Sequence, residues 1–348
     1  ANRHKGVIVL EGRMVERLHL VMARRTVAIA DTIESMQRAE DWLYDAWLMR
    51  TAPVGVDDRV AILDIDEASL KSLGRWPWSR DTMTALVEQL FDHYGVAAVG
   101  FDVVFAEPDT SSGLDTLKQL AYRDLAGSRD FRAALEQLAP RLDYDARFAQ
   151  ALAERPISLG YYFIPQGYGD ARTGMLPPPS LPADAFSPLQ PGTPPPTGYG
   201  ANLAAFQQAA QGAGFFNMRA DEDGTARQMA LISPFGEGYH LALSASTLRV
   251  AFGGDPALAG IDQQSVLGRQ YRSPWLEVGG LRVPLSADGT AHVPYRAGSP
   301  FPYLSAAQVL AGKAPLEQLE NRIVLLGSTA PGLADLRVTP FSNAFPGV

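Results

Sequence analysis

Residues 59–109 have the sequence RVAILDIDEASLKSLGRWPWSRDTMTALVEQLFDHYGVAAVGFDVVFAEPD, and this stretch decides the fold. Its two apolar runs, Val60–Ile65 and Val96–Phe101, are short and rich in β-branched residues, which is typical of parallel strands buried on both faces. Between them, Thr82–Phe91 repeats apolar residues at helical spacing, and Asp81 is the predicted cap of this helix. A strand, a helix and a second strand in this order predict a βαβ unit.

Two later apolar runs extend this unit. Ile157–Phe163 and Ile323–Gly327 have the same buried character. We therefore predict an α/β fold with a mainly parallel central sheet, flanking helices and added β-hairpins, preceded by a long N-terminal helix. The strands Val60–Ile65 and Ile323–Gly327 should lie in one sheet. Further helices are expected at Thr116–Leu125, Asp130–Leu138, Tyr144–Glu154, His240–Phe252 and Ser305–Leu310.

Two Asp-Gly turns predict the added hairpins. The first turn, Asp223-Gly224, should join residues 214–218 to 228–232, and the second, Asp288-Gly289, should join residues 281–284 to 291–294. The first turn also begins like the D-x-D-G of a calcium loop. The glutamate that closes an EF-hand loop does not follow, so a tight turn is the preferred interpretation.

Residues 1–52 are expected to form a separate N-terminal unit, an amphipathic and membrane-proximal helix. From Arg13 to Ala52 there is neither glycine nor proline, and Pro53 ends the stretch. Apolar residues recur every seven positions, which is half of a coiled-coil seam; they are Val15, Met22, Ile29, Met36 and Leu43. This stripe either packs on its own domain or forms the seam of a homodimer. The rings of Trp42, Tyr44 and Trp47, with Leu43, should be buried.

The remaining residues, 53–348, are expected to form one α/β domain. Within it, residues 166–200 carry two triple-proline runs, Pro177–Pro179 and Pro194–Pro196. Such a composition favours polyproline-like conformations over packed helices and strands. We therefore expect a surface excursion without packed elements.

Composition narrows the class of protein. With 348 residues and 46% hydrophobic content the chain can bury a full core, and a formal net charge of −8 argues against a nucleic-acid surface. The sequence has no cysteine, which excludes disulfides and thiolate metal sites and fits a bacterial periplasm. No apolar run approaches the ~20 residues of a membrane helix. Ala1 and Val348 are expected to be cut points, with localisation signals outside them.

Sequence motifs of enzymes are missing. The chain has no G-x-x-x-x-G-K-[ST], no G-x-G-x-x-G after a strand, no H-E-x-x-H and no G-x-S-x-G. Its five histidines are scattered along the sequence, which gives little support to a histidine metal site or a catalytic triad. No catalytic residue and no cofactor are therefore expected in this fragment.

Polar and aromatic residues follow the predicted parallel strands. Because the carboxyl ends of such strands meet at one edge of the sheet, a small ligand is expected there. The candidate ligand-binding residues are Asp66, Trp76, Trp78, Arg80, Asp102, Glu107, Ser328 and Thr329. The rings of Trp76 and Trp78 either wall such a pocket or plug the end of the sheet, and the plug is the preferred interpretation.

Carboxylates at the same edge are weak candidates for a metal site. Asp64, Asp66 and Asp102 are oxygen ligands of the kind that Mg²⁺ and Ca²⁺ prefer. Alternatively they cap helices or pair with Arg80 or Arg227, which is the preferred reading. A metal held by these three residues would indicate a hydrolase-like α/β enzyme, the alternative to a binding domain.

Three separated blocks of the sequence together resemble the CHASE2 domain, the extracytoplasmic sensor of bacterial transmembrane receptors. The blocks are VAILDIDEASLKSLGRWPWSR with GFDVVFAEPD, then GFFNMRADEDGTARQMALI, and finally NRIVLLGSTAPGLADLRVTP with the closing FPGV. The resemblance covers roughly residues 39–348. It implies a sensory domain joined through transmembrane helices to a cytoplasmic output: a class III adenylate or guanylate cyclase, a histidine kinase, a Ser/Thr kinase or a diguanylate cyclase.

This resemblance favours signal sensing over catalysis. It implies a periplasmic domain of an inner-membrane protein, anchored in the full-length receptor by segments outside this sequence. The expected output is a cyclase that makes cAMP or cGMP, and because class III cyclases complete their sites from two chains, a homodimer is expected. The signal would be an unknown periplasmic small molecule or protein. A further alternative is a domain that recognises a periplasmic protein through residues 166–200.

Overall fold

The computed structural model describes residues 7–10, 13–16, 36, 38–187, 194–221, 223–266, 269–298, 301–330 and 336–347. The chain divides into two compact units, Ala1–Pro53 and Val54–Val348, and each is described by itself. Within the described residues, no helix combines the length and the apolar character needed to cross a membrane.

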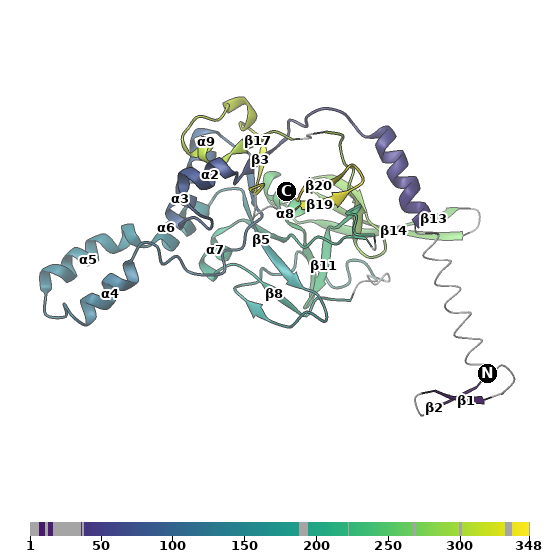
Figure 1. The fold of residues 1–348 in the computed structure, drawn as a ribbon, viewed down its shortest axis with the longest axis horizontal. Helices are drawn as coiled ribbons and strands as arrows, with labels where there is room; N and C mark the ends of the chain where they lie inside the picture. Colours follow the sequence, from purple (N-terminus) through teal and green to yellow (C-terminus); the bar gives the residue numbers. More distant parts are fainter. Residues whose placement is uncertain are drawn as a thin grey trace. The chain divides into compact units, whose positions relative to one another are not determined.

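The larger unit is built on an eight-stranded sheet (Figure 1). Its strands, in spatial order, are β17 (Tyr303–Ser305), β3 (Val60–Asp64), β18 (Ile323–Gly327), β4 (Ala98–Phe101), β5 (Ile157–Ile164), β8 (Gly198–Gly200) and β6 (Arg172–Thr173), with β9 (Gly212–Phe215) also paired to β5. The pairs among β17, β3, β18, β4, β5 and β9 are all parallel. The predicted parallel sheet is confirmed, and β3 lies directly beside β18 as expected.

Helices cover both faces of this sheet. One layer contains α2 (Glu67–Leu73), α3 (Arg80–Glu88), α6 (Tyr144–Leu152), α7 (Ala204–Ala209) and α9 (Ala306–Leu310), and the main apolar core lies between this layer and the strands. On the other face α8 (Leu243–Ala251) packs against β4, β5 and β9. A Cβ added at Gly100 would meet the Thr247 side chain at 2.5 Å, so glycine is required where α8 approaches the sheet.

The first helix of the βαβ unit begins earlier than predicted. Ser79, not Asp81, is the cap of α3, and its side chain accepts a hydrogen bond from the Thr82 amide. Asp81 lies in the first turn and forms an ion pair with Arg147 instead. The helix continues as a π-helical turn over Gln89–His93.

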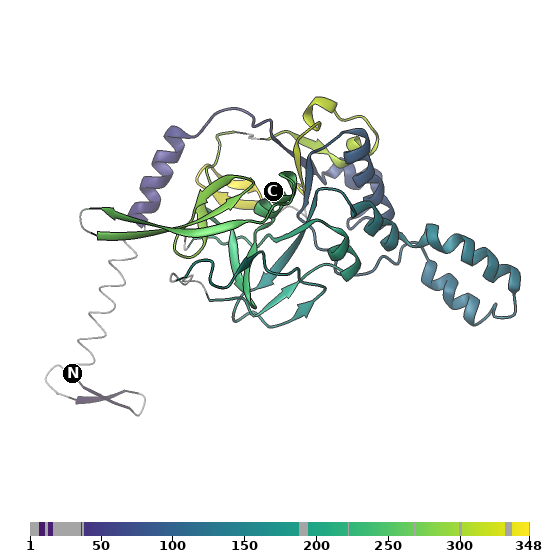
Figure 2. The ribbon, with the colours of Figure 1, turned by 180° about the vertical axis from the view of Figure 1, so that it is seen from behind.

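A helical pair leaves the body of the larger unit. The predicted helices after the second strand are α4 (Leu114–Tyr122) and α5 (Arg129–Leu142), which pack on each other. Figures 1 and 2 show this pair projecting away from the sheet rather than covering the end of β4. The helices expected at Thr116–Leu125 and Asp130–Leu138 are confirmed, and no residue of α5 is buried.

Both predicted hairpins are wrong in their pairing. Residues 212–215 form β9, which joins the central sheet because this pairing buries Phe215 to 1% exposure. β10 (Gln228–Ala230) then pairs with β16 (Thr290–His292), and β15 (Leu281–Pro284) pairs with β14 (Arg269–Val278). None of these strands therefore pairs with the strand on the other side of its Asp-Gly turn.

The remaining strands and helical turns lie outside the central sheet. They are β11 (Ile232–Phe235) with β12 (Gly238–Leu241) and β7 (Leu181–Pro182), β13 (Leu258–Val266) with β14, β19 (Leu336–Thr339) with β20 (Ser342–Pro346), and the 3₁₀ turn Leu316–Gln318. The helix expected from His240 begins only at Leu243, because His240 belongs to β12.

The proline-rich segment 166–200 contains packed elements, contrary to expectation. β8 pairs antiparallel with β5, and β6 lies parallel to β8. β7 pairs with β12, and Phe186 nearby is only 3% exposed. Of these strands only β7 contains a proline, Pro182, and β7 lies at the edge of its sheet, where a missing backbone N–H is tolerated. Pairing with β5 and β12 therefore holds the segment on the domain.

The N-terminal unit begins with an antiparallel hairpin of β1 (Val7–Leu10) and β2 (Arg13–Glu16). Val15 pairs with Ile8 across it, so the prediction of a helix starting at Arg13 is wrong. The β-branched run Val7–Val9 lies in the partner strand. The helix prediction rests on the absence of glycine and proline from Arg13 onward and does not consider this upstream run. Met22 and Ile29 lie outside the described residues.

The described helix of this unit spans residues 38–51, and Met36 is also helical. Met36, Leu43, Trp42 and Trp47 are 62%, 59%, 69% and 60% exposed. The expected burial of Trp42, Leu43 and Trp47 is therefore wrong, while Tyr44 is half-buried with its ring 6.3 Å from that of Trp47. The described helix therefore exposes large apolar side chains.

Candidate functional site

The carboxyl edge of the sheet brings several predicted residues together through hydrogen bonds. Asp66 caps α2 by accepting from the Ser69 amide at 2.7 Å, and the Ser305 hydroxyl donates to the same carboxylate at 3.0 Å. Ser69 in turn accepts from the Ala307 amide at 3.0 Å. These bonds connect α2 with the start of α9, so Asp66 has a structural role.

The loop after β18 closes over β3 in the same way. Asp64 accepts from the Thr329 amide at 2.8 Å and from the Thr329 hydroxyl, while the Ser328 hydroxyl donates to the Ile65 carbonyl at 3.0 Å. The side chains of Asp64, Ser328 and Thr329 are thus used in hydrogen bonds to one another or to the backbone.

Arg80 is a buried cation at this edge. Its guanidinium donates to the Glu107 carbonyl at 3.0 Å and lies 4.7 Å from the ring centre of Phe105. The Nε atom has no hydrogen-bond partner, but it faces the Asp145 carboxylate at 3.7 Å. Burial lowers the pKa of Arg80, and the charges of Asp145 and Asp109 oppose this shift. Burial raises the pKa of Asp145.

The two tryptophans pack rather than open a pocket. Their rings meet edge to face at 5.2 Å, and Trp78 is only 4% exposed within the main core. The indole N–H of Trp78 donates to the Gly74 carbonyl at 3.1 Å, and Trp76 packs half-buried against the same core. This geometry favours the plug over the pocket wall.

The carboxylates of the described residues do not gather as metal ligands. Over the described ranges, no group of three or more Asp, Glu or His side chains is placed to hold a metal ion. Asp102 is half-buried with its amide bonded to the Leu326 carbonyl, and Glu107 is exposed. At the calcium-like turn, Asp221 and Asp223 both pair with Arg227, which lowers the pKa of Asp223 to about 2. The geometry favours capping and pairing over a metal.

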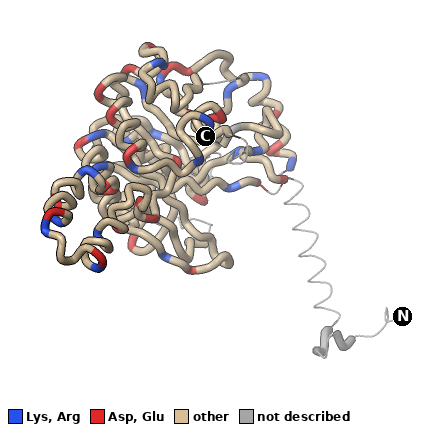
Figure 3. The backbone as a smooth tube through the Cα atoms, turned by 60° about the vertical axis from the view of Figure 1, so that its left-hand side comes forward, with Lys and Arg blue, Asp and Glu red and all other residues tan. Residues whose placement is uncertain are grey.

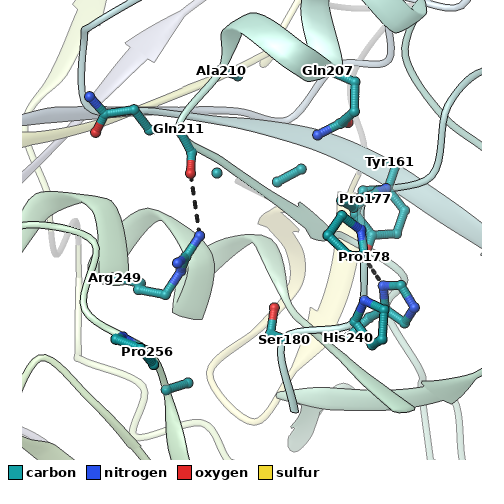
Figure 4. Close-up of a pocket in the computed structure, with 14 residues that line it drawn as sticks. Tyr161, Pro177, Pro178, Ser180, Gln207, Ala210, Gln211, His240, Arg249 and Pro256 are labelled. Atoms are coloured by element: carbon teal, nitrogen blue, oxygen red, sulfur yellow. Dashed lines mark hydrogen bonds between the residues drawn. The ribbon is translucent and has the colours of Figure 1, made fainter. Parts of the chain in front are cut away.

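A cavity of about 350 Å³ lies elsewhere in the larger unit, and none of the eight candidate ligand-binding residues lines it. Figure 4 shows its walls: α7 with the segment leading into β9, α8, β12 and the first triple-proline run. Its lining residues are Tyr161, Pro177, Pro178, Pro179, Ser180, Gln207, Ala210, Gln211, Gly212, Ala213, His240, Arg249, Pro256 and Ala257. We call this cavity the proline-walled pocket.

Tyr161 and His240 form one polar pair in this pocket. The Tyr161 hydroxyl lies 3.1 Å from His240 Nδ1, and both residues are almost fully buried. Burial raises the pKa of Tyr161 and lowers that of His240 to about 4, an effect that a hydrogen bond to the Phe235 backbone partly offsets. Both side chains are therefore neutral at pH 7.

Arg249 and Gln207 approach the pocket from opposite helices (Figure 4). Arg249 donates to the carbonyls of Gly254 and Gln211 at 3.2 and 3.3 Å, while its buried Nε has no hydrogen-bond partner. Gln207 is 9% exposed, and its Oε1 also lacks a partner. Native structures leave few such buried atoms unpaired, so each needs an explanation.

A second cavity, of about 500 Å³, lies between α3 and α6. Its arginines are already paired: Arg147 with Asp81, and Arg155 with Asp92. Figure 3 shows the same mixing of basic and acidic residues over the described elements. The arginines of this cavity have carboxylate partners, whereas Gln207 and Arg249 of the proline-walled pocket each have a buried polar atom without a hydrogen-bond partner.

Sequence reasoning missed the proline-walled pocket although two signals were present. His240 and Arg249 are the titratable residues of a segment that otherwise consists of apolar and small hydroxyl residues, where a titratable side chain is unusual. The triple proline at 177–179 predicts only a surface excursion. The sequence did not show that this run reaches β12, where the Ser180 amide donates to the Tyr239 carbonyl at 2.9 Å.

Comparison with known proteins identifies the family. No curated protein and no solved structure matches the chain. A family model, that of the CHASE2 domain, matches residues 20–348, which is nearly the whole chain. The chain therefore belongs to the CHASE2 family of extracytoplasmic sensory domains, which are not catalytic.

Proposed function

We propose that this chain is the periplasmic input domain of an inner-membrane receptor whose cytoplasmic output is a class III adenylate or guanylate cyclase. The observation that carries the proposal is the CHASE2 match over residues 20–348. The geometry supports it, because the strand-end carboxylates Asp64 and Asp66 are used for capping and loop closure. A domain of this kind binds a signal and passes it to another part of the receptor.

The receptor works as a homodimer in this proposal. Met36 and Leu43 are seven residues apart on the described helix and are both more than half exposed. Trp42 and Trp47 add exposed apolar surface to the same helix. Exposed groups of this size favour burial against a partner, and a second copy of the helix supplies a matching stripe. A shift between the two helices would then carry the signal to the paired cyclase domains.

The placement and output are tested in the full-length receptor. Alkaline phosphatase, which is active only outside the cytoplasm, is inserted after Gly298, and cyclic nucleotide formation is measured in cells with and without the receptor. High phosphatase activity together with receptor-dependent cAMP or cGMP is expected. An inactive phosphatase fusion whose protein accumulates normally would refute the periplasmic placement, and unchanged cAMP and cGMP would refute the cyclase output.

The dimer is tested separately on the 348-residue chain. Met36→Glu with Leu43→Glu places charges in the proposed seam and should convert a dimer to a monomer in light scattering. The far-UV circular dichroism should stay unchanged because both side chains are exposed. A matched control is Arg50→Glu, a charge change on an exposed residue of the same helix. A wild type that is monomeric at high concentration would contradict the proposal.

A further inference from the structure

The amide nitrogen of Gln207 faces the proline-walled pocket and has no partner in the protein. Gln207 is only 9% exposed, and within the described residues its Nε2 forms no hydrogen bond. Its Oε1 is fully enclosed, whereas Nε2 is not among the enclosed atoms and points from α7 into the pocket (Figure 4). Native proteins rarely leave the donor of a buried side chain unused. Nε2 therefore marks a place where an oxygen atom of a ligand can accept a hydrogen bond.

Arg249 gives the same pocket a positive charge. Of the fourteen described residues that line the pocket, none is an aspartate or glutamate. The guanidinium of Arg249 donates to the neutral carbonyls of Gly254 and Gln211, which do not cancel its charge. Burial lowers the pKa of Arg249, and no carboxylate of the described residues opposes this shift as Asp145 does for Arg80. A poorly solvated charge acts over several ångströms, so this pocket favours an anion.

The rest of the wall determines the size and the apolar part of a ligand. Pro177, Pro178 and Ala210 contribute apolar groups, and a cavity of about 350 Å³ is within the size range of small-molecule sites. Tyr161 and His240 are bonded to each other and are both neutral at pH 7, so they add no charge. The pocket therefore suits a small organic molecule with one negatively charged oxygen group and an apolar ring or chain.

We propose that the proline-walled pocket binds a small organic monocarboxylate, whose carboxylate accepts a hydrogen bond from Gln207 Nε2 and is attracted by the charge of Arg249. This ligand would be the signal of the receptor, and that role alone rests on the proposed function. The pocket suits an input site because its wall belongs to several elements. An occupant touches α7, α8 and the segment that the bond from Ser180 to Tyr239 fastens to β12.

The binding test compares two acids with their uncharged amides, which have nearly the same shape. The pairs are benzoate with benzamide, for a ring, and hexanoate with hexanamide, for a chain. Titration of the 348-residue chain by calorimetry, at pH 7 and constant ionic strength, should give saturable binding of at least one acid. Its amide should bind about 10-fold more weakly, because a hydrogen bond to a charged acceptor is stronger than one to a neutral carbonyl.

Variants assign this preference to its residues. Gln207→Glu keeps the shape but replaces the donor by a carboxylate, so it should weaken binding of the acid at least about 10-fold and leave the amide unaffected. Gln208→Glu makes the same change on the exposed neighbour in α7, which does not line the pocket, and should leave both affinities unchanged. Arg249→Met should weaken the acid only. If Gln207→Glu does not fold, Gln207→Leu should weaken the acid about 10-fold instead.

Three results would overturn the proposal. One is the absence of saturable binding by both acids, and another is tighter binding of an amide than of its acid, which would mean that Oε1 rather than Nε2 faces the cavity. The third is a preference for the acid that survives the changes at Gln207 and Arg249. These tests measure binding only, so they fail independently of the cyclase test. A receptor whose cyclase responds to the acid in wild type and in Gln208→Glu, but not in Gln207→Glu, would connect the two.

Discussion

Two regions of the larger unit carry the same kinds of side chain but use them differently. At the carboxyl edge of the sheet, Asp66 and Asp64 have hydrogen-bond partners on neighbouring loops and helices. Even the unpaired Arg80 Nε faces a carboxylate, that of Asp145, at 3.7 Å. Beside the proline-walled pocket, the buried atoms Arg249 Nε and Gln207 Oε1 have no such counterpart, although both residues line the cavity.

This difference shows that polar residues at strand ends do not by themselves indicate a ligand site. A carboxylate at a sheet edge lies where ligands bind in many α/β proteins, yet here the edge is closed by its own hydrogen bonds. Residue type and position therefore identify candidates, and only the accounting of partners separates a structural network from a binding site. The predictions below test this separation, from the largest expected effect to the smallest.

The largest effect is expected from Trp78→Ala. The ring is 4% exposed within the main core, and removing a buried aromatic side chain costs about 3–5 kcal/mol. Urea unfolding followed by circular dichroism measures this loss. Trp76→Ala, at the half-buried neighbour, is the control and should cost less. A Trp78→Ala protein of wild-type stability would show that the rings wall an open pocket rather than plug the sheet.

The parts of the fold that the sequence predicted are those set by local pattern. Val60–Ile65 is apolar except for Asp64, and Ile323–Gly327 is apolar throughout. Such runs indicate buried strands wherever their partners lie. The long strands β13 and β14 were missed because polar residues such as Gln263 and Arg272 interrupt any apolar pattern. The predicted strand pairing was also wrong, because Gln228 pairs with His292 and not with a residue across the Asp223-Gly224 turn.

The pocket was less predictable than the fold for a related reason. It forms from segments that are far apart in sequence, which bring Pro177, Gln207 and Arg249 together. Whether Gln207 has a partner depends on all of these segments at once. By contrast, the carboxylate cap at Asp66 depends on Ser69 three residues later, and the sequence left this role open among its alternatives.

The next effect concerns His240 in the pocket, whose pKa falls from 6.5 to about 4 because burial disfavours its charged form. As pH falls below about 6.5, the unfolded state takes up the proton first, so the folded state loses stability until about pH 4. The loss should approach about 3 kcal/mol. It is measured as the pH dependence of the free energy of unfolding in urea.

His240→Asn is the control for this pH dependence. It should be less stable than wild type at pH 7 but should lack the loss between pH 6.5 and 4. Carboxylates with lowered pKa values, such as Asp223 at about 2, lose their contribution only below about pH 4. An unchanged slope in the variant would show that another group titrates in this window.

A smaller effect is expected at the closed edge. Asp66→Ala removes the cap of α2 and the acceptor of the Ser305 hydroxyl, and such a cap contributes about 1–2 kcal/mol. Asp66→Asn keeps an oxygen at the cap and should lose only a few tenths of a kcal/mol. Thermal unfolding of the two variants measures the difference. Equal losses would mean that the negative charge, rather than the cap, is what matters at this position.

The smallest effect on stability is expected from Gln207→Leu. The variant Asn202→Leu provides the comparison. Asn202 is also a buried amide, but it accepts from the Phe105 amide at 2.8 Å and donates to the Gly160 carbonyl at 3.0 Å. Asn202→Leu leaves both partners unsatisfied and should cost at least about 2 kcal/mol. Gln207→Leu removes an atom that has no partner, so it should not destabilise the protein.

Urea unfolding of the two leucine variants in parallel decides the point. If Gln207→Leu is as destabilising as Asn202→Leu, the Gln207 amide is held by the protein, and the pocket is as closed as the sheet edge. If it is nearly neutral, the amide is retained at a buried position where it does not stabilise the fold. That result would give the Gln207 amide no structural role, although its residue lines the proline-walled pocket.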